Sequence, residues 1–184
     1  MTINRKKFFD GIRQGPFPGK LNAKQVQGIS AILDEWERRR LTDLRHLSNM
    51  LGTSYLETAM TMQPITEYGS QKYLRAKKYW PWIGRGLVQI TWEANYIKFC
   101  ARVLNQFGVD IVANPDAALR MDVAVFIMFE GMINGEFTGK KLSDYFNSKI
   151  TDWLNARHII NRMDRAAYVA GWSKMFYADL VAAS

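Results

Sequence analysis

The spacing of apolar residues predicts a chain built mostly from helices. We expect a short helix over residues 4–13, a break at the Gly- and Pro-rich segment 14–19, and a second helix over residues 22–40. The second helix has an apolar stripe at intervals of three or four residues, made by Val26, Ile29, Ile32 or Leu33, and Trp36. Asn22 and Gln25 have the spacing of a capping box at its start.

A third helix is expected over residues 42–60, with an apolar stripe formed by Leu44, Leu47, Leu51 and Tyr55. At about 100° per residue, Glu57 lies roughly 220° around this helix from Leu44 and therefore off the stripe. Two interpretations follow. Glu57 is a carboxylate at the edge of a cleft, or it is a solvent-exposed helical glutamate, and pattern alone favours the second.

Residues 64–81 are predicted to form a long polar loop, either irregular or with a little strand. A structureless loop of this length inside a compact protein is usually functional. It carries four large aromatic residues, Tyr68, Tyr73, Tyr79 and Trp80. Their rings suit stacking on sugar faces, and they equally suit anchoring the loop to the core.

The second half of the chain again has helical spacing. One core stripe is expected at Trp92, Tyr96, Phe99 and Val103. Asn114-Pro115 is typical of a helix start, and the helix that follows, to about residue 132, should form the buried centre of the fold. Thr151-Asp152 should open another helix. The last helix should bury Tyr168, Trp172, Met175 or Phe176, and Leu180.

Composition changes this picture little. The chain has 184 residues, of which 48% are hydrophobic and 23% charged, as is ordinary for a globular protein. We expect a mainly α fold with at most a small β element, and one domain over residues 1–184 without a second module. The single Cys100 excludes an internal disulfide and is expected to be a buried structural thiol.

The net charge of +8 predicts attraction to polyanions such as the anionic bacterial envelope. The basic residues are dispersed, at 38–40, 77–78 and 140–141, which argues against a specific nucleic-acid site. The N-terminus lacks the apolar run of a signal peptide, and no segment has the length of a membrane span. We therefore expect the protein to stay in the cytoplasm until another factor opens the membrane.

A concentration of polar side chains lies between Gly84 and Tyr96. Two glycines flank Arg85, so the backbone can bend there and approach a ligand. Thr91 is expected to cap the following helix. Together with Gln89 and Asn95 it would form a ledge of neutral hydrogen-bonding groups that suits a hydroxyl-rich or amide-rich ligand, or a water held for attack.

A pair of carboxylates precedes this ledge, at Glu57 and Glu67. Most enzymes that hydrolyse a glycosidic bond use two carboxyl groups, one as acid and one as base or nucleophile. Metal catalysis lacks support, because His46 and His158 are far apart in sequence and have no ligand-like spacing. No Gly-rich phosphate loop is present. We expect no metal and no cofactor.

These motifs together resemble family 19 glycoside hydrolases, the chitinase-like enzymes. The family's His-Glu-Thr followed by a second Glu is matched by Leu56-Glu57-Thr58 and Glu67, and its Gly-Arg-Gly…Gln…Thr…Asn-Tyr motif by residues 84–96. Asn114-Pro115-Asp116…Leu119 and Ile159-Ile160-Asn161 resemble further landmarks in the right order. The resemblance spans residues 44–180. The chain departs from the pattern at Leu56, where the family usually has His, and at Arg162, where it usually has Gly.

The resemblance is nearest to small phage endolysins that cut peptidoglycan, and it implies a lysozyme-like helical fold with a long active-site loop. Glu57 would be the general acid, with Leu56, Met60 and Met62 as its apolar surroundings. Glu67 would be the base, and Thr91 with Asn95 would hold the attacking water. Sugar contacts would come from Gln89, Tyr96 and Asn161.

Arg85 would either organise the cleft and contact an acidic group, or form a salt bridge that braces the turn, and we favour the bracing role. The expected partners are peptidoglycan glycan strands. The resemblance also implies a monomer that reaches the periplasmic cell wall from the host cytoplasm through a holin.

Other functions stay open. A chitinase would use the same chemistry on a related glycan. From other classes, a non-catalytic wall-binding protein is suggested by Leu56, and a basic nucleic-acid-binding protein by the net charge. The presence of both glutamates and the ledge argues against the first, and the dispersed cations argue against the second.

Overall fold

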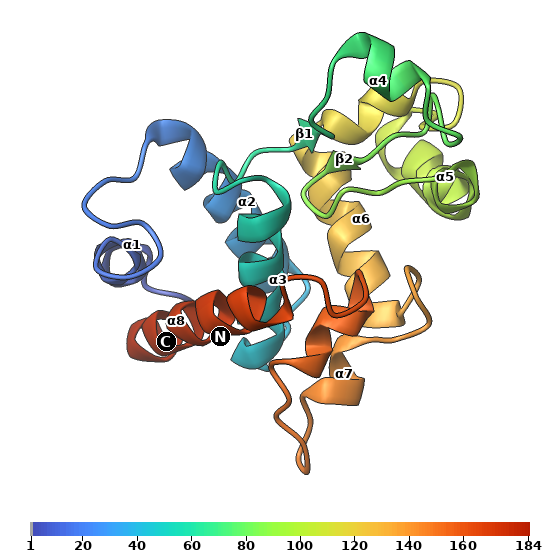
Figure 1. The fold of residues 1–184 in the computed structure, drawn as a ribbon. Helices are drawn as coiled ribbons and strands as arrows, with labels where there is room; N and C mark the ends of the chain where they lie inside the picture. Colours follow the sequence, from blue (N-terminus) through green and yellow to red (C-terminus); the bar gives the residue numbers. More distant parts are fainter. Residues whose placement is uncertain (1) are drawn as a thin grey trace.

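The computed structural model describes residues 2–184, and it is mainly helical with one two-stranded sheet (Figure 1). This confirms the predicted fold class. The elements are α1 (Arg5–Ile12), α2 (Ala23–Arg38), α3 (Leu44–Glu57), β1 (Ile65–Thr66), α4 (Gln71–Arg75), β2 (Arg85–Gly86), α5 (Glu93–Phe107), the 3₁₀ helix η1 (Pro115–Leu119), α6 (Met121–Asn134), α7 (Leu142–Tyr145), the 3₁₀ helix η2 (Asn155–Ile159) and α8 (Ala166–Ala183).

Polar caps define where the early helices begin. The predicted capping box is confirmed: Asn22 Oδ1 accepts from the Gln25 backbone N–H at 2.8 Å, and Gln25 Oε1 accepts from the Asn22 N–H at 2.9 Å. Asn4 caps α1 in the same way, accepting from Lys7 N–H at 3.0 Å. These bonds satisfy backbone donors that have no partner inside the first helical turn.

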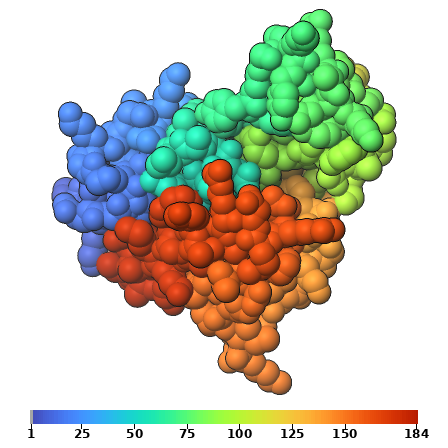
Figure 2. Space-filling view, in the orientation of Figure 1, coloured from blue at the N-terminus to red at the C-terminus, as the bar shows by residue number. Residues whose placement is uncertain are grey.

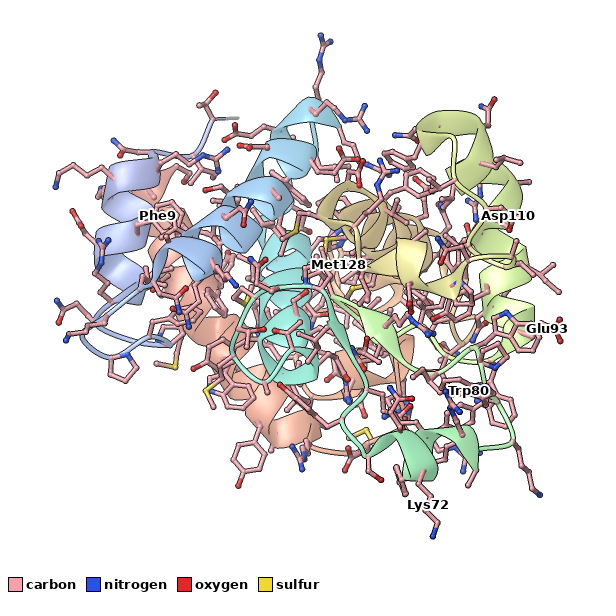
Figure 3. The ribbon with its side chains drawn as sticks, turned by 90° about the horizontal axis from the view of Figure 1, so that it is seen from above. Phe9, Lys72, Trp80, Glu93, Asp110 and Met128 are labelled. Carbon is pink, nitrogen blue, oxygen red and sulfur yellow. The ribbon has the colours of Figure 1, made fainter. Side chains whose placement is uncertain are left out.

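Helix α6 occupies the centre of the molecule, as predicted. Most of its side chains are buried, and they divide between two apolar clusters. One cluster joins α6 to α1, α2, α3 and α8, and the other joins it to α5 and η1. In the view from above, Met128 lies near the middle of the molecule, with Phe9 on one side and Asp110 on the other (Figure 3). A helix that is apolar all round requires such burial.

Helices α3 and α8 pack closely across the other side of the core (Figure 1). Gly52 makes the approach possible, because a Cβ atom there would come within 2.9 Å of the Ser173 backbone nitrogen. The end of α8 also meets the beginning of the chain, where Asn4 N–H donates to the Ala183 carbonyl at 2.8 Å. These contacts give the cleft described below a rigid support.

The predicted long loop contains a small strand and one short helix that the sequence pattern did not predict. Strands β1 and β2 are antiparallel and pair Ile65 with Gly86 and Thr66 with Arg85. Between them the chain forms α4 and an extended turn that stands out from the helices (Figure 1). Ser70 caps α4 by accepting from Tyr73 N–H at 3.2 Å.

Three predicted helix details are wrong. Asn114-Pro115 starts a 3₁₀ helix, and α6 begins separately at Met121. Thr151 lies in an isolated bridge with Phe146, and the following helical segment is η2. The buried face of α8 also differs from the predicted one at Tyr168.

In α8, Phe176, the alternative to Met175, and Leu180 are buried as predicted and Trp172 is half-buried, while Tyr168 is 65% exposed. The core positions are instead Val169, Ala170 and Ser173. Small residues such as Ala170 and Ser173 lie inward because α8 packs tightly against α3, so Tyr168 is displaced to the rim. Within residues 2–184, every helix is too short or too polar to cross a lipid bilayer.

Candidate functional site

Most of the predicted site residues meet in one cleft of about 380 Å³. Its lining comes from the end of α3, the loop after α4, the turn before α5, α5 itself, the turn after α6 and the segment after η2: Glu57, Tyr79, Val88, Gln89, Ile90, Thr91, Trp92, Asn95, Phe137, Ile160 and Asn161. In the space-filling view the green segment that carries β1 and α4 stands above the orange-red segment near residue 160 (Figure 2). Chain segments a hundred residues apart thus form one concave surface.

Glu57 is the last residue of α3, and its side chain is only 16% exposed. The interpretation as a solvent-exposed helical glutamate is therefore wrong. Its Oε1 lies 2.7 Å from Arg157 Nη1, although the two groups are not aligned for a hydrogen bond. Arg157 is almost fully buried, and its Nε donates to the Asp164 carbonyl at 2.9 Å. The guanidinium is thus fixed in place beside the cleft carboxylate.

The apolar surroundings predicted for Glu57 are only partly present. Met62 is buried, but Met60 is 51% exposed, and Leu56 is half-buried. The dominant neighbour of Glu57 is the cation Arg157, which the sequence analysis missed. No motif marked Arg157. It lies between Asn155 and His158 in a segment of mixed polarity, so neither hydropathy nor spacing singled it out.

Glu67 follows β1 and is held by three hydrogen bonds. Its Oε1 accepts from the Tyr79 hydroxyl at 2.9 Å and its Oε2 from Gly84 N–H at 3.2 Å, while its own N–H donates to the Gly84 carbonyl at 2.7 Å. Burial and the bond to Glu67 raise the pKa of Tyr79, so this hydroxyl keeps its proton. Since Tyr79 lines the cleft, it links Glu67 to the other site residues.

Three predicted site residues, Glu67, Gln89 and Thr91, lie around Gly84. A Cβ atom on Gly84 would lie 2.8 Å from Gln89 Oε1, 3.3 Å from Glu67 Cβ and 3.4 Å from Thr91 Oγ1. The predicted base and two members of the ledge therefore surround this glycine. A side chain at residue 84 would push these residues apart, so glycine is what lets the backbone lie this close to them.

The side chains of Gln89, Thr91 and Asn95 donate hydrogen bonds to backbone carbonyls, which leaves their oxygen atoms as acceptors. Gln89 Nε2 donates to the carbonyls of Ile65 and Gly86 at 3.0 and 3.2 Å. Thr91 Oγ1 donates to the Gln89 carbonyl at 2.8 Å, and Asn95 Nδ2 donates to the Thr91 carbonyl at 2.7 Å. The side-chain oxygens keep free lone pairs, so the ledge suits the hydroxyls or amide N–H groups of a ligand, or a water.

Thr91 does not cap α5, which corrects the prediction. The residue at the cap position is Trp92, with a φ of 74° and no side-chain hydrogen bond to the helix. Gln89 also has a positive φ, of 53°. Non-glycine residues in this conformation are strained by about 1–2 kcal/mol each, and such strain tends to occur at functional sites.

Trp92 was predicted to be core, and this too is wrong. It is 52% exposed and lines the cleft, where its ring meets the Tyr79 ring edge-on with centroids 5.0 Å apart. The strained backbone turns Trp92 away from the stripe that buries Tyr96, Phe99 and Val103. The helical spacing alone could not reveal this, because it assumes regular helix geometry from residue 92 onward.

Arg85 and Tyr96 were candidate substrate contacts, but both are buried and neither lines the cleft. Arg85 Nε donates to Asp116 Oδ1 at 2.8 Å, and its Nη1 donates to the Pro81 carbonyl at 2.9 Å. Tyr96 donates to the Ile83 carbonyl at 2.8 Å, and burial raises its pKa to about 12. The bracing role that we favoured for Arg85 matches this network, which holds the turn from residue 81 to residue 96.

The remaining reactive groups lie elsewhere. Cys100 Sγ is 3.1 Å from Asp110 Oδ1, and burial together with this bond raises the thiol pKa, so the sulfur is a poor nucleophile. His46 Nε2 is 3.0 Å from the Phe146 carbonyl. Within residues 2–184 no three histidine, cysteine, aspartate or glutamate side chains gather as metal ligands would.

No protein-family model matches the chain, and no curated protein matches it. The cleft and the sequence motifs are therefore what point to a function.

Proposed function

We propose that this protein is a glycoside hydrolase that cleaves the β-1,4 glycosidic bond of bacterial cell-wall glycan, as the resemblance to family 19 endolysins implies. The observation that carries the proposal is the cleft itself. It places Glu57 beside Gln89, Thr91, Asn95 and Asn161, and a second carboxylate, Glu67, is hydrogen-bonded to a tyrosine of the same cleft. Two carboxylates beside a ledge of oxygen acceptors suit hydrolysis of a sugar chain.

In the proposed mechanism Glu57 gives its proton to the oxygen of the leaving sugar as the glycosidic bond breaks. Arg157 then lies 2.7 Å from the carboxylate that this transfer leaves behind. A fixed cation at that position stabilises the developing negative charge without reorganisation. Arg157 would thus be a positioning residue for Glu57.

Glu67 takes a proton from the water that attacks the anomeric carbon. The water would be held by oxygens of Thr91 and Asn95, which face the cleft with free lone pairs. Tyr79 and Gly84 N–H fix both oxygens of Glu67. Direct attack by water implies inversion at the anomeric carbon, with carboxyl groups roughly 6.5–9.5 Å apart.

The exposed ring of Trp92, supported by Tyr79, offers an apolar face at the cleft. Aromatic rings bind the apolar faces of sugars while leaving the hydroxyls to polar neighbours. This assigns Trp92 a sugar contact in place of the buried Tyr96. A lysozyme-like arrangement, helical with a small β element beside the cleft, fits the same proposal.

The test is lysis of outer-membrane-permeabilised bacteria by the purified protein, followed by mass spectrometry of the released muropeptides. Falling turbidity with new reducing ends would support hydrolysis, and activity on chitin alone would instead indicate a chitinase. Binding to sacculi without any product would indicate a wall-binding protein. A 1,6-anhydro product would show transglycosylation, in which no water breaks the bond, and Glu67 would lose its role.

A further inference from the structure

A second hollow of about 490 Å³ continues from the cleft and is basic. Its lining is Thr138, Lys140, His158, Ile160, Asn161 and Arg162. Ile160 and Asn161 also line the main cleft, so the two hollows adjoin at these residues. No carboxylate lines this second hollow, whereas the main cleft contains Glu57.

The backbone around the basic hollow is tied in place. Thr138 Oγ1 donates to the His158 carbonyl at 2.6 Å, joining the turn after α6 to η2. Gly135 allows this turn to double back, because a Cβ atom there would lie 3.3 Å from the carbonyl carbon of Lys140. Asn161 Oδ1 accepts from Arg162 N–H at 2.8 Å. The turn after α6 and the segment after η2 therefore contribute Lys140 and Arg162 to the lining of one hollow.

The cations themselves are free to meet a ligand. Lys140 and Arg162 are exposed, and within residues 2–184 neither forms an ion pair. Arg157, five residues earlier, is instead buried against Glu57. Exposed lysines and arginines are ordinary on any surface. Their position on an extension of the cleft, without a carboxylate in that extension, is what distinguishes this pair.

We propose that Lys140 and Arg162 form a subsite for the carboxylates of the wall peptides that hang from the glycan strand. This inference depends on the proposed function and names its substrate more closely. Peptidoglycan carries anionic peptides on alternate sugars, whereas chitin carries no charge. A strand seated in the cleft would place a peptide over the adjoining hollow, where two cations attract its carboxylates. The departure from the family pattern at Arg162 then has a role in choosing the substrate.

The test compares two variants that each remove two positive charges. Lys140→Gln/Arg162→Gln alters the subsite, and Lys7→Gln/Lys20→Gln removes two exposed, unpaired lysines from the other end of the molecule. Binding is measured on ice and at low salt to three probes. These are sacculi free of phosphate polymers, glycan strands stripped of peptides by an amidase, and uncharged chito-oligosaccharide.

We expect the subsite variant to bind sacculi roughly 2- to 30-fold more weakly, since each exposed charge pair contributes about 0.2–1 kcal/mol. The loss should shrink on stripped strands and vanish on chito-oligosaccharide and at high salt, while the control binds as the wild type does. Equal binding of sacculi by the subsite variant and the control would overturn the subsite. So would an undiminished loss on stripped strands, or an equal loss on the uncharged sugar.

The same experiment separates this inference from the proposed function. A wild type that releases no muropeptides but binds sacculi through Lys140 and Arg162 would refute hydrolysis and support the subsite. A wild type that lyses cells, with a subsite variant that binds normally, would support hydrolysis and refute the subsite.

Discussion

The packed helices α1, α2, α3, α6 and α8, called the helical support, differ in backbone conformation from the segment over residues 58–92. Within residues 2–184, seven non-glycine residues have positive φ, and five of them fall between Ala59 and Trp92. The other two flank helices, at Arg40 and Arg165. Strain thus concentrates between α3 and α5, in the segment called the cleft wall because its residues 79 and 88–92 line the cleft, while the helices have relaxed backbones.

Side-chain hydrogen bonds, two of them local and one from α2, hold the strained segment in place. Buried Thr58 donates to the Ser54 carbonyl at 2.7 Å and accepts from Met62 N–H at 3.0 Å. From α2, Gln25 Nε2 donates to the Met60 carbonyl at 3.0 Å. The helices therefore follow local propensity, whereas the cleft wall depends on specific side-chain hydrogen bonds, from nearby residues as well as from α2. Strain persists only where such surroundings over-determine the conformation.

The largest effect should come from the carboxylate at the junction of the two regions. Glu57→Gln should lower the lytic rate by about 10²–10⁴-fold, because an amide cannot give a proton to the leaving oxygen. The measurement is initial lysis rate, with circular dichroism to verify folding. Normal lysis by a folded variant would remove Glu57 from the mechanism.

A matched control exists in Glu130→Gln. Glu130 is 17% exposed, close to the 16% of Glu57, and it pairs with Arg39 at 2.6 Å on α6, away from the cleft. Glu57→Gln leaves Arg157 without its carboxylate, whereas after Glu130→Gln both partner arginines keep another one, Arg39 with Glu35 and Arg102 with Glu136. Both variants should lose stability, Glu130→Gln the less. Only Glu57→Gln should lose activity. Equal losses of activity would mean that the ion pair matters only for folding.

The second prediction concerns the contact between α3 and α8, which lies outside the cleft. Gly52→Ala should destabilise the protein by about 1–3 kcal/mol, because its Cβ would press on the Ser173 backbone across the α3–α8 contact. Gly171→Ala in the same helix pair meets nothing within 4 Å and should instead stabilise by about 0.5–1 kcal/mol. Urea unfolding measures both. A neutral Gly52→Ala would show that the two helices can move apart freely.

The two regions also differ in what the sequence could predict. Helix starts such as the Asn22 capping box follow from residues three positions apart, so pattern suffices. The inward face of α8 was misjudged, because close packing against α3 favours small residues over Tyr168. The mistake at Trp92 has another cause, since its φ of 74° depends on contacts that no periodicity records.

The site residues show the same division. The motifs located Glu57, Gln89, Thr91, Asn95 and Asn161, which the fold brings into one cleft. Arg157 could not be found in this way, because it is marked only by its contact with Glu57, a hundred residues earlier. The roles of these residues in catalysis stay predictions.

The third prediction tests the ledge. Thr91→Ala should lower the lytic rate about two- to tenfold, the value of one hydrogen bond to a neutral group. Thr91→Ser keeps the hydroxyl that donates to the Gln89 carbonyl and should retain most activity. Because Thr91 does not cap α5, the loss of stability should be limited to that one hydrogen bond, about 0.5–1.5 kcal/mol in Thr91→Ala and little in Thr91→Ser, as thermal unfolding would show. If both variants lose activity equally, the hydroxyl is not the relevant group.

The smallest effect should come from relieving strain where no ligand is involved. Met60 has a φ of 66° and is 51% exposed, and it does not line the cleft. Met60→Gly removes the Cβ that makes this conformation costly, and Met60→Ala keeps it. Glycine should therefore be the more stable of the two by about 1 kcal/mol, even though glycine normally disfavours the folded state. Urea unfolding of both variants measures the difference, and lysis should be unchanged in each. If alanine proved the more stable, residue 60 would not hold its left-handed conformation in solution, and the contrast between a relaxed support and a strained cleft wall would fail at this residue.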